Sequence, residues 1–306
     1  MLSDPGGLDQ GPLVVAGGPP PGSLGGGRHR PALHGRRAIA VSAASTVVFL
    51  AVLAALFFLA PGSAQVRQTF FNLPDARTAF FGNTRGGIFS EAAALVLNIE
   101  MFLIAEVLIL ILAMVIAMIR QLRGPVTFPL RMLAIVYTDF FRGVPLLLVI
   151  YAIGFGVPAL NLAGVSTQLP VVYGMVALVL SYSAYVSEVY RAGIESVHPS
   201  QVAAARSLGL SQLQALRSVV MPQAVRRVIP PLLNDFISLQ KDTALIAVLG
   251  VIEVNRAAGI VSSTDFNYTG YTVAAFLFLL LTVPLARFTD WLIARDRRRR
   301  QAGTAH

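Results

Sequence analysis

The sequence predicts an all-α polytopic membrane protein with six transmembrane helices. Hydrophobic residues make up 55% of the 306 residues and charged residues only 13%, whereas soluble domains carry about 25% charged residues. Six apolar runs are long enough to cross a hydrocarbon core of about 30 Å. The arginine-rich segments between them all fall on one side of the membrane, as the positive-inside rule expects. Because this topology explains the net charge of +9, we expect a lipid bilayer and no nucleic acid as a partner.

The N-terminal part is predicted to carry a tail and one extra helix. Residues 1–37 are rich in Gly and Pro, so we expect a disordered cytosolic tail that buries too little apolar surface to fold. Residues 38–60 are uniformly apolar and predict the first transmembrane helix. The small residues 62–64 also fit a signal-peptide cleavage site, so a retained and a cleaved first helix both remain open. Residues 61–92 are predicted to form a polar external loop.

Residues 93–294 are predicted to hold the other five transmembrane helices, and a basic cytosolic tail, residues 295–306, follows them. Residues 253–268, between the last two helices, are expected to form an external loop. Six crossings place both termini in the cytosol. The five predicted spans are residues 93–119, 132–157, 171–189, 229–252 and 272–293.

The residue types exclude several kinds of chemistry. The chain has no cysteine, which excludes disulfides, thiol catalysis and cysteine-ligated metals. Its single lysine, Lys241, follows Gln240, so a phosphate-binding loop that ends in Gly-Lys-Ser/Thr cannot form. We therefore expect no catalytic residue, metal or cofactor on this chain, and any ATP that drives it must be bound by another protein.

The cytosolic stretch 196–222 is predicted to form two short helices joined by a turn. Ser200 is a good N-cap for the first helix, and the proline before it suits a helix start. Gly209 is expected to end that helix in the left-handed conformation. Ser211 and the glutamine three residues later match a capping box for the second helix, which Pro222 is expected to end. An ordinary cytosolic hairpin fits the same local pattern.

Charged residues inside the spans are costly and usually face a protein interior or a watery pathway. The pathway or helix-interface candidates are Glu106, Asp139, Arg142, Pro145, Glu188, Arg191, Lys241 and Asp242. Pro145 has no N–H to offer the Phe141 carbonyl, so it should kink or interrupt the third span, and broken helices at mid-depth often line transporter sites.

Each charged group also has a plainer interpretation. Glu106 fits a buried hydrogen bond to another helix as well as a place on a substrate path. Asp139 with Arg142, and Glu188 with Arg191, stand three residues apart, which is the spacing of an intrahelical ion pair. Lys241 and Asp242 are adjacent and point in different directions on a helix, so each is expected to pair with another helix or to face the translocation path.

The cytosolic stretch resembles the EAA loop of ABC importer permeases. Three small residues, Ala203 to Ala205, are followed by Gly209 and then by the Val-Val-Met-Pro of residues 219–222. Ala203 stands where the family usually has Glu, which by position is the third-residue partner of a Ser200 capping box. The resemblance implies an ATPase-coupling loop that comprises Ser200, Ala203, Ala204, Ala205, Arg206, Gly209, Leu210 and Pro222.

Three further stretches resemble the polar amino-acid permeases within that family. They are residues 137–148 (YTDFFRGVPLLL), 182–197 (YSAYVSEVYRAGIESV) and 234–249 (NDFISLQKDTALIAVL). The resemblance implies a permease subunit of an ATP-driven importer for polar amino acids or their derivatives in a bacterial inner membrane, and not an enzyme. The implied partners are an ATP-binding cassette ATPase that binds ATP and Mg, an extracytoplasmic solute-binding protein, and a second permease in a homodimer or heterodimer.

Two other classes of protein remain open at the level of the residues. An ion-coupled secondary transporter of small polar solutes would carry its own ion site, for which Glu106, Asp139, Lys241 and Asp242 are candidates. A membrane scaffold that transports nothing would need neither these intramembrane charges nor the cytosolic loop.

Overall fold

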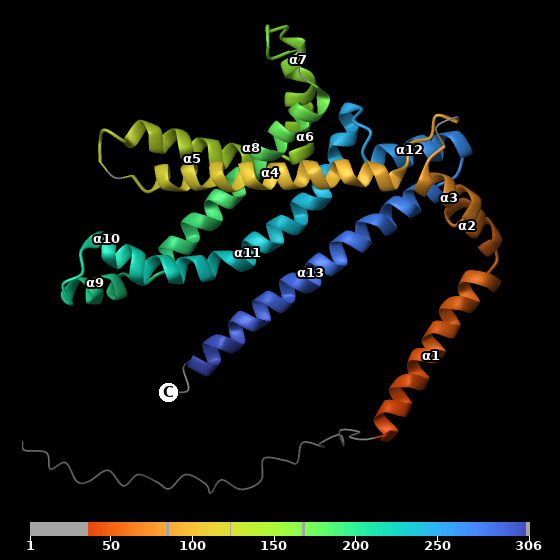
Figure 1. Cartoon of the computed structure of the whole chain (residues 1–306), viewed down its shortest axis with the longest axis horizontal. Helices are drawn as coiled ribbons and strands as arrows, with labels where there is room; N and C mark the ends of the chain where they lie inside the picture. The colour runs from red at the N-terminus through yellow and green to blue at the C-terminus, as the bar shows by residue number, and fades with distance from the viewer. Residues whose placement is uncertain (1–35, 84–85, 123, 167–168, 304–306) are drawn as a thin grey trace, which may run out of the picture. The chain divides into compact units, whose positions relative to one another are not determined.

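The computed structural model describes residues 36–83, 86–122, 124–166 and 169–303 (Figure 1). The predicted Gly/Pro-rich tail, except for its last two residues, and the end of the basic tail lie outside the described residues. The predicted all-α class is confirmed, because the described part consists of helices and contains no strand beyond one isolated bridge between Asn83 and Ile88. The chain divides into two compact units, residues 1–60 and 61–306.

The first unit contributes one described helix, α1 (Arg36–Leu59). Residues Ile39–Leu59 are long and apolar enough to cross a membrane. Ala, Val, Leu and Phe dominate the sequence all around this helix, which is the pattern of a span that contacts lipid on every face. The predicted first transmembrane helix is therefore present as a helix of the required length.

The expectation of a plain loop at residues 61–92 is wrong. Two short helices, α2 (Ser63–Phe70) and α3 (Leu73–Phe81), occupy most of this stretch. Contacts distant in sequence hold them: the Tyr268 N–H donates to the Thr69 carbonyl over 2.7 Å, and Asn267 Nδ2 donates to Asp75 Oδ2 over 2.7 Å. Helices this short are marginal alone, so local pattern did not reveal them.

The centre of the second unit is the pair α4 (Glu91–Arg120) and α8 (Pro170–Glu195), with α5 (Phe128–Gly143) and α11 (Met221–Asp242) packed against α8 (Figure 1). Small residues let these backbones approach closely, as is usual in membrane helix pairs. A Cβ on Gly193 of α8 would lie 2.1 Å from Val228 Cγ1 of α11. Five buried residues recur at a spacing of four along one face of α4: Met101, Ala105, Ile109, Ala113 and Ala117.

The predicted interruption at Pro145 is confirmed, and it is sharper than a kink. Helix α5 ends at Gly143, where the Val144 N–H still donates to the Phe140 carbonyl over 3.0 Å. Pro145 then begins α6 (Leu146–Tyr151), which continues through a π-helical turn into α7 (Val157–Ala159). The two halves of this predicted third span meet at 107°, because the proline cannot continue the helical hydrogen bonds.

The prediction that Pro222 ends a helix is wrong. Helix α10 (Gln212–Ala215) passes through the π-helical segment Leu216–Val220 directly into α11. The Met221 N–H donates to the Leu216 carbonyl, five residues back. This wider turn replaces the normal register just before Pro222, so the ring is accommodated and the chain stays helical.

A second bend separates α11 from α12 (Val254–Asp265), which corrects the expected external loop at residues 253–268. A 3₁₀ segment, Thr243–Leu249, leads to the bend, and the two halves meet at 52°. Glu253 caps α12 by accepting from the Asn255 and Arg256 N–H groups over 3.0 and 2.8 Å. Glutamate is not a usual N-cap residue, so the sequence carried no strong sign of this helix.

A buried polar network fixes that bend against α4. Asn98 Nδ2 donates to Thr243 Oγ1 and to Glu253 Oε2, each over 3.1 Å. The Val254 N–H donates to Asn98 Oδ1 over 3.1 Å. Asn98, Thr243 and Glu253 are at most 1% exposed, so one side chain of α4 satisfies groups on both sides of the bend.

Helix α13 (Thr269–Gly303) runs continuously from the predicted sixth span into the basic tail. By length and composition, four described helices can cross a membrane, or up to six if each bent pair counts as one span. The predicted six spans therefore hold only when the pairs bent at Pro145 and before α12 are each counted as a single crossing.

Candidate functional site

The first helix of the cytosolic loop is α9 (Pro199–Ser207). It begins two residues earlier than an N-cap at Ser200 would place it. His198 is the N-cap, and its Nδ1 accepts from the Ser200 N–H over 3.2 Å. The prediction of Ser200 as N-cap is therefore wrong. Ala203 is the fifth helical residue, so it does not hold the capping-box position that we expected for a Glu there. Proline at the first helical position explains the shift, since it needs no N–H partner there.

The turn after α9 has the predicted glycine geometry. Gly209 has φ +86°, in the left-handed region. Its N–H donates to the Arg206 carbonyl over 3.0 Å, and the Leu210 N–H donates to the Ala205 carbonyl over 3.3 Å. These two bonds define a Schellman motif, so the shape of the loop depends on a residue that accepts positive φ.

The predicted capping box at the second loop helix is confirmed. The Ser211 N–H donates to Gln214 Oε1 over 2.8 Å, and the Gln214 N–H donates to Ser211 Oγ over 3.3 Å. The reciprocal bonds fix where α10 begins relative to the turn at Gly209. Both ends of the turn are thus held by specific hydrogen bonds.

One face of the first loop helix packs against the rest of the loop, and the opposite face is exposed in this chain. Ala205 is buried, and α9 packs against residues 216–220. Ala203, Ala204 and Arg206 are exposed, and Leu208 is 82% exposed. Apart from Arg206 and Leu208, these exposed residues are small.

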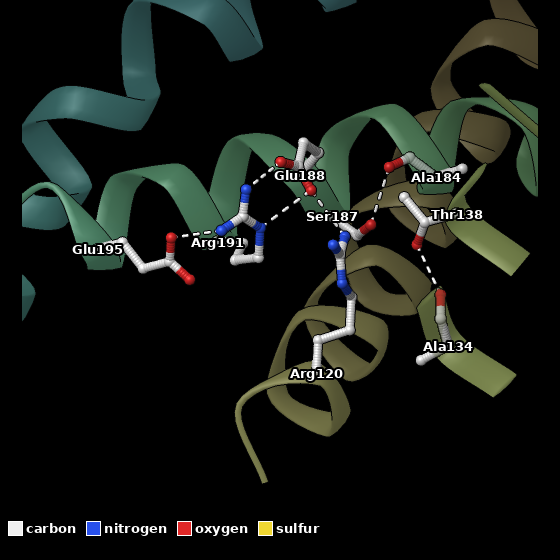
Figure 2. Close-up of polar contacts among 8 residues, drawn as sticks. All are labelled: Arg120, Ala134, Thr138, Ala184, Ser187, Glu188, Arg191 and Glu195. Carbon is white, nitrogen blue, oxygen red and sulfur yellow. Dashed lines mark hydrogen bonds and ion pairs between the residues drawn. The ribbon is translucent and has the colours of Figure 1, made fainter. Parts of the chain in front are cut away.

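An ionic cluster joins the end of α4 to the part of α8 that leads into the loop (Figure 2). Glu188 of α8 lies between Arg120, at the end of α4, and Arg191. Arg120 Nη1 is 2.7 Å from Glu188 Oε2, and Arg191 Nε donates to the same oxygen over 3.1 Å. Arg191 also pairs with Glu195, the residue before the loop. The predicted pair of Glu188 with Arg191 is confirmed, and Arg120 of α4 joins it.

The expected ion pair of Asp139 with Arg142 is absent from the described part of the chain. Both side chains are exposed. The Arg142 guanidinium instead lies over the ring of Tyr185, 5.8 Å from its centroid, and the Tyr185 hydroxyl donates to the Arg142 carbonyl over 3.1 Å. Arg142 thus makes a cation–π contact with Tyr185 of the neighbouring helix α8 instead of an ion pair with Asp139 on its own helix.

Two cavities lie beside the break at Pro145. One, of about 230 Å³, is lined by residues 141–146 with Ser181 and Tyr185. The other, of about 220 Å³, is lined mainly by polar residues of α8 and α11. Its lining residues are Leu146, Ser181, Tyr182, Tyr185, Asp235, Ser238 and Asp242.

The two candidate residues of the fifth span, Lys241 and Asp242, have different surroundings in the structure. Asp242 lines the second cavity, where it accepts from the Tyr182 hydroxyl over 2.7 Å. Lys241 is exposed in this chain, so its place on the translocation path stays a prediction. Asp235 was missed, although it stands seven residues before Asp242 and two helical turns place both on one face. The oxygen Asp235 Oδ2 is buried without a hydrogen-bond partner among the described residues.

Glu106 lines a third cavity, of about 370 Å³, among apolar residues of α4, α11 and α13. The side chain is half-buried. No hydrogen bond joins it to another helix within the described ranges, so the plainer interpretation of this residue gains no support.

The comparisons with known proteins decide the family. A model described as "Binding-protein-dependent transport system inner membrane component" matches residues 110–298, more than half of the chain. The chain belongs to this family. The matched segment begins inside α4 and ends inside α13, so α1, α2 and α3 lie outside it.

Individual relatives agree with the family model. The chain is 37% identical over 170 residues to the probable glutamine ABC transporter permease protein GlnM of Bacillus subtilis (strain 168), which covers 55% of the chain and 76% of the relative. It is 34% identical over 189 residues to the probable amino-acid ABC transporter permease protein PatM of Vibrio harveyi, covering 61% and 82%. A solved structure titled "Crystal structure of an amino acid ABC transporter with histidines" matches with a TM-score of 0.61 and 29% identity, over 67% of this chain and 92% of that one.

The chain is therefore a multi-pass inner-membrane permease subunit of an ABC importer and not an enzyme. In these systems ATP and Mg act on a separate ATPase subunit, and permease subunits work with that partner. The alternatives of an ion-coupled secondary transporter and of a non-transporting scaffold are not supported.

Proposed function

We propose that this chain forms the translocation path of an importer for polar amino acids or their derivatives. The observation that carries the proposal is the pair of cavities beside the break at Pro145, one lined in part by Arg142 and the other by Asp235 and Asp242. Broken membrane helices commonly line transport sites at mid-depth, and Arg142 and Asp242 offer opposite charges there. The names of the relatives, glutamine and amino-acid permeases, agree with this substrate class.

The loop of residues 196–222 is the proposed dock for the ATPase. Its exposed face, with Ala203, Ala204, Arg206 and Leu208, is held rigid by the caps at both ends of the Gly209 turn. Ser200, Leu210 and Pro222 serve its shape rather than the contact itself. Glu188 of α8, which leads into the loop, pairs with Arg120 of α4, so a displacement of the loop that moves α8 also moves α4.

The remaining features of the assembly follow from the same proposal. The loop and the arginine-rich segments lie in the cytosol, which places both termini there. A second permease, identical or different, completes the pathway, and an extracytoplasmic binding protein delivers the substrate. Residues 1–37 are a cytosolic tail, 38–60 an additional membrane helix, 93–294 the permease domain and 295–306 a basic cytosolic extension.

The docking proposal is tested with Gly209→Val. A β-branched residue strains a position with φ +86°, so the turn should lose its shape while the bundle stays inserted. The matched control is Gly87→Val, at a position far from the loop in sequence. Gly87 also has positive φ, +72°, and, as at Gly209, an added Cβ would meet no atom within 4 Å.

The chain is purified gently from native membranes, and its partners are identified by mass spectrometry. We expect a stoichiometric subunit with a phosphate-binding loop, retained by the Gly87 variant and lost by the Gly209 variant. Retention of the ATPase and normal uptake by Gly209→Val at normal abundance would refute the dock. Two copies of this chain, or this chain with a second permease, distinguish the homodimer from the heterodimer.

A further inference from the structure

Helices α2 and α3 each expose an apolar face. On α2, Val66 and Phe70 stand four residues apart, which places them on one side of the helix, and both are exposed. On α3, Leu73 and Phe81 share one side and are 81% and 69% exposed. The opposite side of α3 is packed, since Ala79 is fully buried. Large apolar side chains gathered on one exposed surface indicate that another apolar body covers it.

Aromatic rings extend this surface onto the turn before α13. Phe70 stacks on Tyr268 with ring centroids 5.6 Å apart, and Tyr268 stacks on Tyr271 at 6.2 Å. All three rings are exposed. Phe266, in the same turn, is 94% exposed and has φ +52°, a conformation that is costly for a bulky side chain. Tyrosine rings, which are apolar with a polar tip, gather at the interface between membrane and water.

Hydrogen bonds tie both helices to the ends of membrane spans (Figure 1). The Ser90 hydroxyl, one residue before the α4 span, donates to the Phe80 carbonyl over 2.7 Å. The Tyr268 N–H, one residue before the α13 span, donates to the Thr69 carbonyl over 2.7 Å. Helix α2 also begins four residues after the span Ile39–Leu59 ends, and four residues reach at most about 14 Å. Both helices are therefore held at the level where spans leave the membrane.

The charges of this stretch fit a phospholipid surface. Residues 61–90 contain three basic residues and one acidic residue. Arg77 is exposed and lies between Leu73 and Phe81 on the same side of α3. An arginine within an apolar face lays its stem along apolar surface and keeps its guanidinium at the polar boundary. There a lipid phosphate offers the anion that a guanidinium binds best.

We propose that α2 and α3 lie in the extracytoplasmic interface of the membrane and bind phospholipids there. Their apolar faces enter the boundary between headgroups and acyl chains by about 5–10 Å, and Arg77 pairs with a lipid phosphate. The lipid contact also fixes the turn before α13, because Asn267 and Tyr268 of that turn are bonded to α3 and α2. The side of the membrane rests on the topology given in the proposed function, whereas the contact with lipid rests on the span ends.

The test uses single cysteines that carry a nitroxide label, since the sequence has no cysteine of its own. Val66→Cys, Leu73→Cys and Phe81→Cys place labels on the exposed apolar faces, and Gln68→Cys is the matched control on the polar side of α2. Only complexes that co-purify with the ATPase are used, so the labels report on folded protein. They are reconstituted in vesicles of phosphatidylethanolamine and phosphatidylglycerol. Electron paramagnetic resonance then measures the collisions of each label with oxygen, which dissolves in lipid, and with a water-soluble nickel chelate.

We expect oxygen to relax the three labels on the apolar faces more than the chelate does, and the reverse at Gln68. The corresponding depth is about 5–10 Å below the headgroups. Relaxation dominated by the chelate at all four positions would overturn the inference and would favour a soluble protein as the cover of this surface. Adding Arg77→Glu to Phe81→Cys should shift the ratio toward the chelate, because a carboxylate repels lipid phosphates; an unchanged ratio would overturn the pairing of Arg77 with phosphate.

Amino-acid uptake into the same vesicles tests the proposed function separately. Normal uptake with labels exposed to water overturns the lipid contact and leaves the proposed function standing. Labels in lipid without uptake of any amino acid leave the lipid contact standing and overturn the proposed substrate class.

Discussion

Replacing Asn98 by alanine should destabilise the packing of α4 against the bend before α12. Asn98 makes three hydrogen bonds of 3.1 Å, to Thr243, Glu253 and the Val254 N–H. Each is worth about 0.6–1 kcal/mol net. The loss is therefore about 2–3 kcal/mol before any penalty for the donor left unsatisfied at Val254.

That loss is measurable by thermal unfolding of the purified protein. For a unit of this size, 1 kcal/mol lowers Tm by about 2–4 °C, so we expect a decrease of roughly 4–12 °C for Asn98→Ala. The matched control is Asn234→Ala on α11, where the asparagine is exposed and has no hydrogen bond in the described part of the chain. The control should move Tm by about 1–2 °C at most, since surface substitutions stay within about 0.5 kcal/mol. Equal Tm values for the two variants would refute the assignment of this network as the support of the bend.

Three further substitutions test other contacts. Glu188→Gln leaves Arg120 and Arg191, whose side chains are 12% and 29% exposed, without their carboxylate. We expect the free energy of unfolding to fall by about 1–3 kcal/mol and substrate to stimulate ATP hydrolysis less. The control Glu195→Gln, at 57% exposure, should cost less than about 0.5 kcal/mol, and equal effects of the two variants would contradict the role of the cluster. Gly193→Ala should lower the thermal stability, because its Cβ would lie 2.1 Å from Val228 Cγ1, and the added Val228→Ala should restore it; a failure of this rescue would show that the close approach is not the cause. Gly209→Asn should keep ATPase binding, since asparagine tolerates the left-handed region, and its loss would mean that the side chain itself obstructs the contact.

Several local features were predictable because they depend on residues only a few positions apart. Gly209 ends a helix since glycine adopts positive φ without strain. Ser211 and Gln214 form their capping box within one turn, and Pro145 breaks its helix because a proline ring leaves no N–H at that position. Each of these effects acts through covalent geometry or a bond across three or four residues, so a single sequence contains it.

Other local predictions failed because two local preferences competed. Ser200 is a good N-cap residue, yet His198 caps α9 because Pro199 takes the first helical position. Pro222 normally ends a helix, yet the π-helical segment before it absorbs the ring. The outcome depended on how α9, α10 and the π-helical segment pack against one another, which the pattern of one segment does not contain.

The sequence by itself determined the class of protein, the positions of the apolar spans and the glycine turn of the cytosolic loop. These follow from composition, from the length of apolar runs and from short-range backbone preferences. Only the tertiary structure decided which charges meet. Arg120 reaches Glu188 across 68 positions, and Asn98 reaches Glu253 across 155. Asp235 and Asp242 become one end of a cavity only when α8 and the broken third span close over them. Burial in a low-dielectric interior selects these pairings, because a polar group that leaves water must find its partner wherever the packed helices place one.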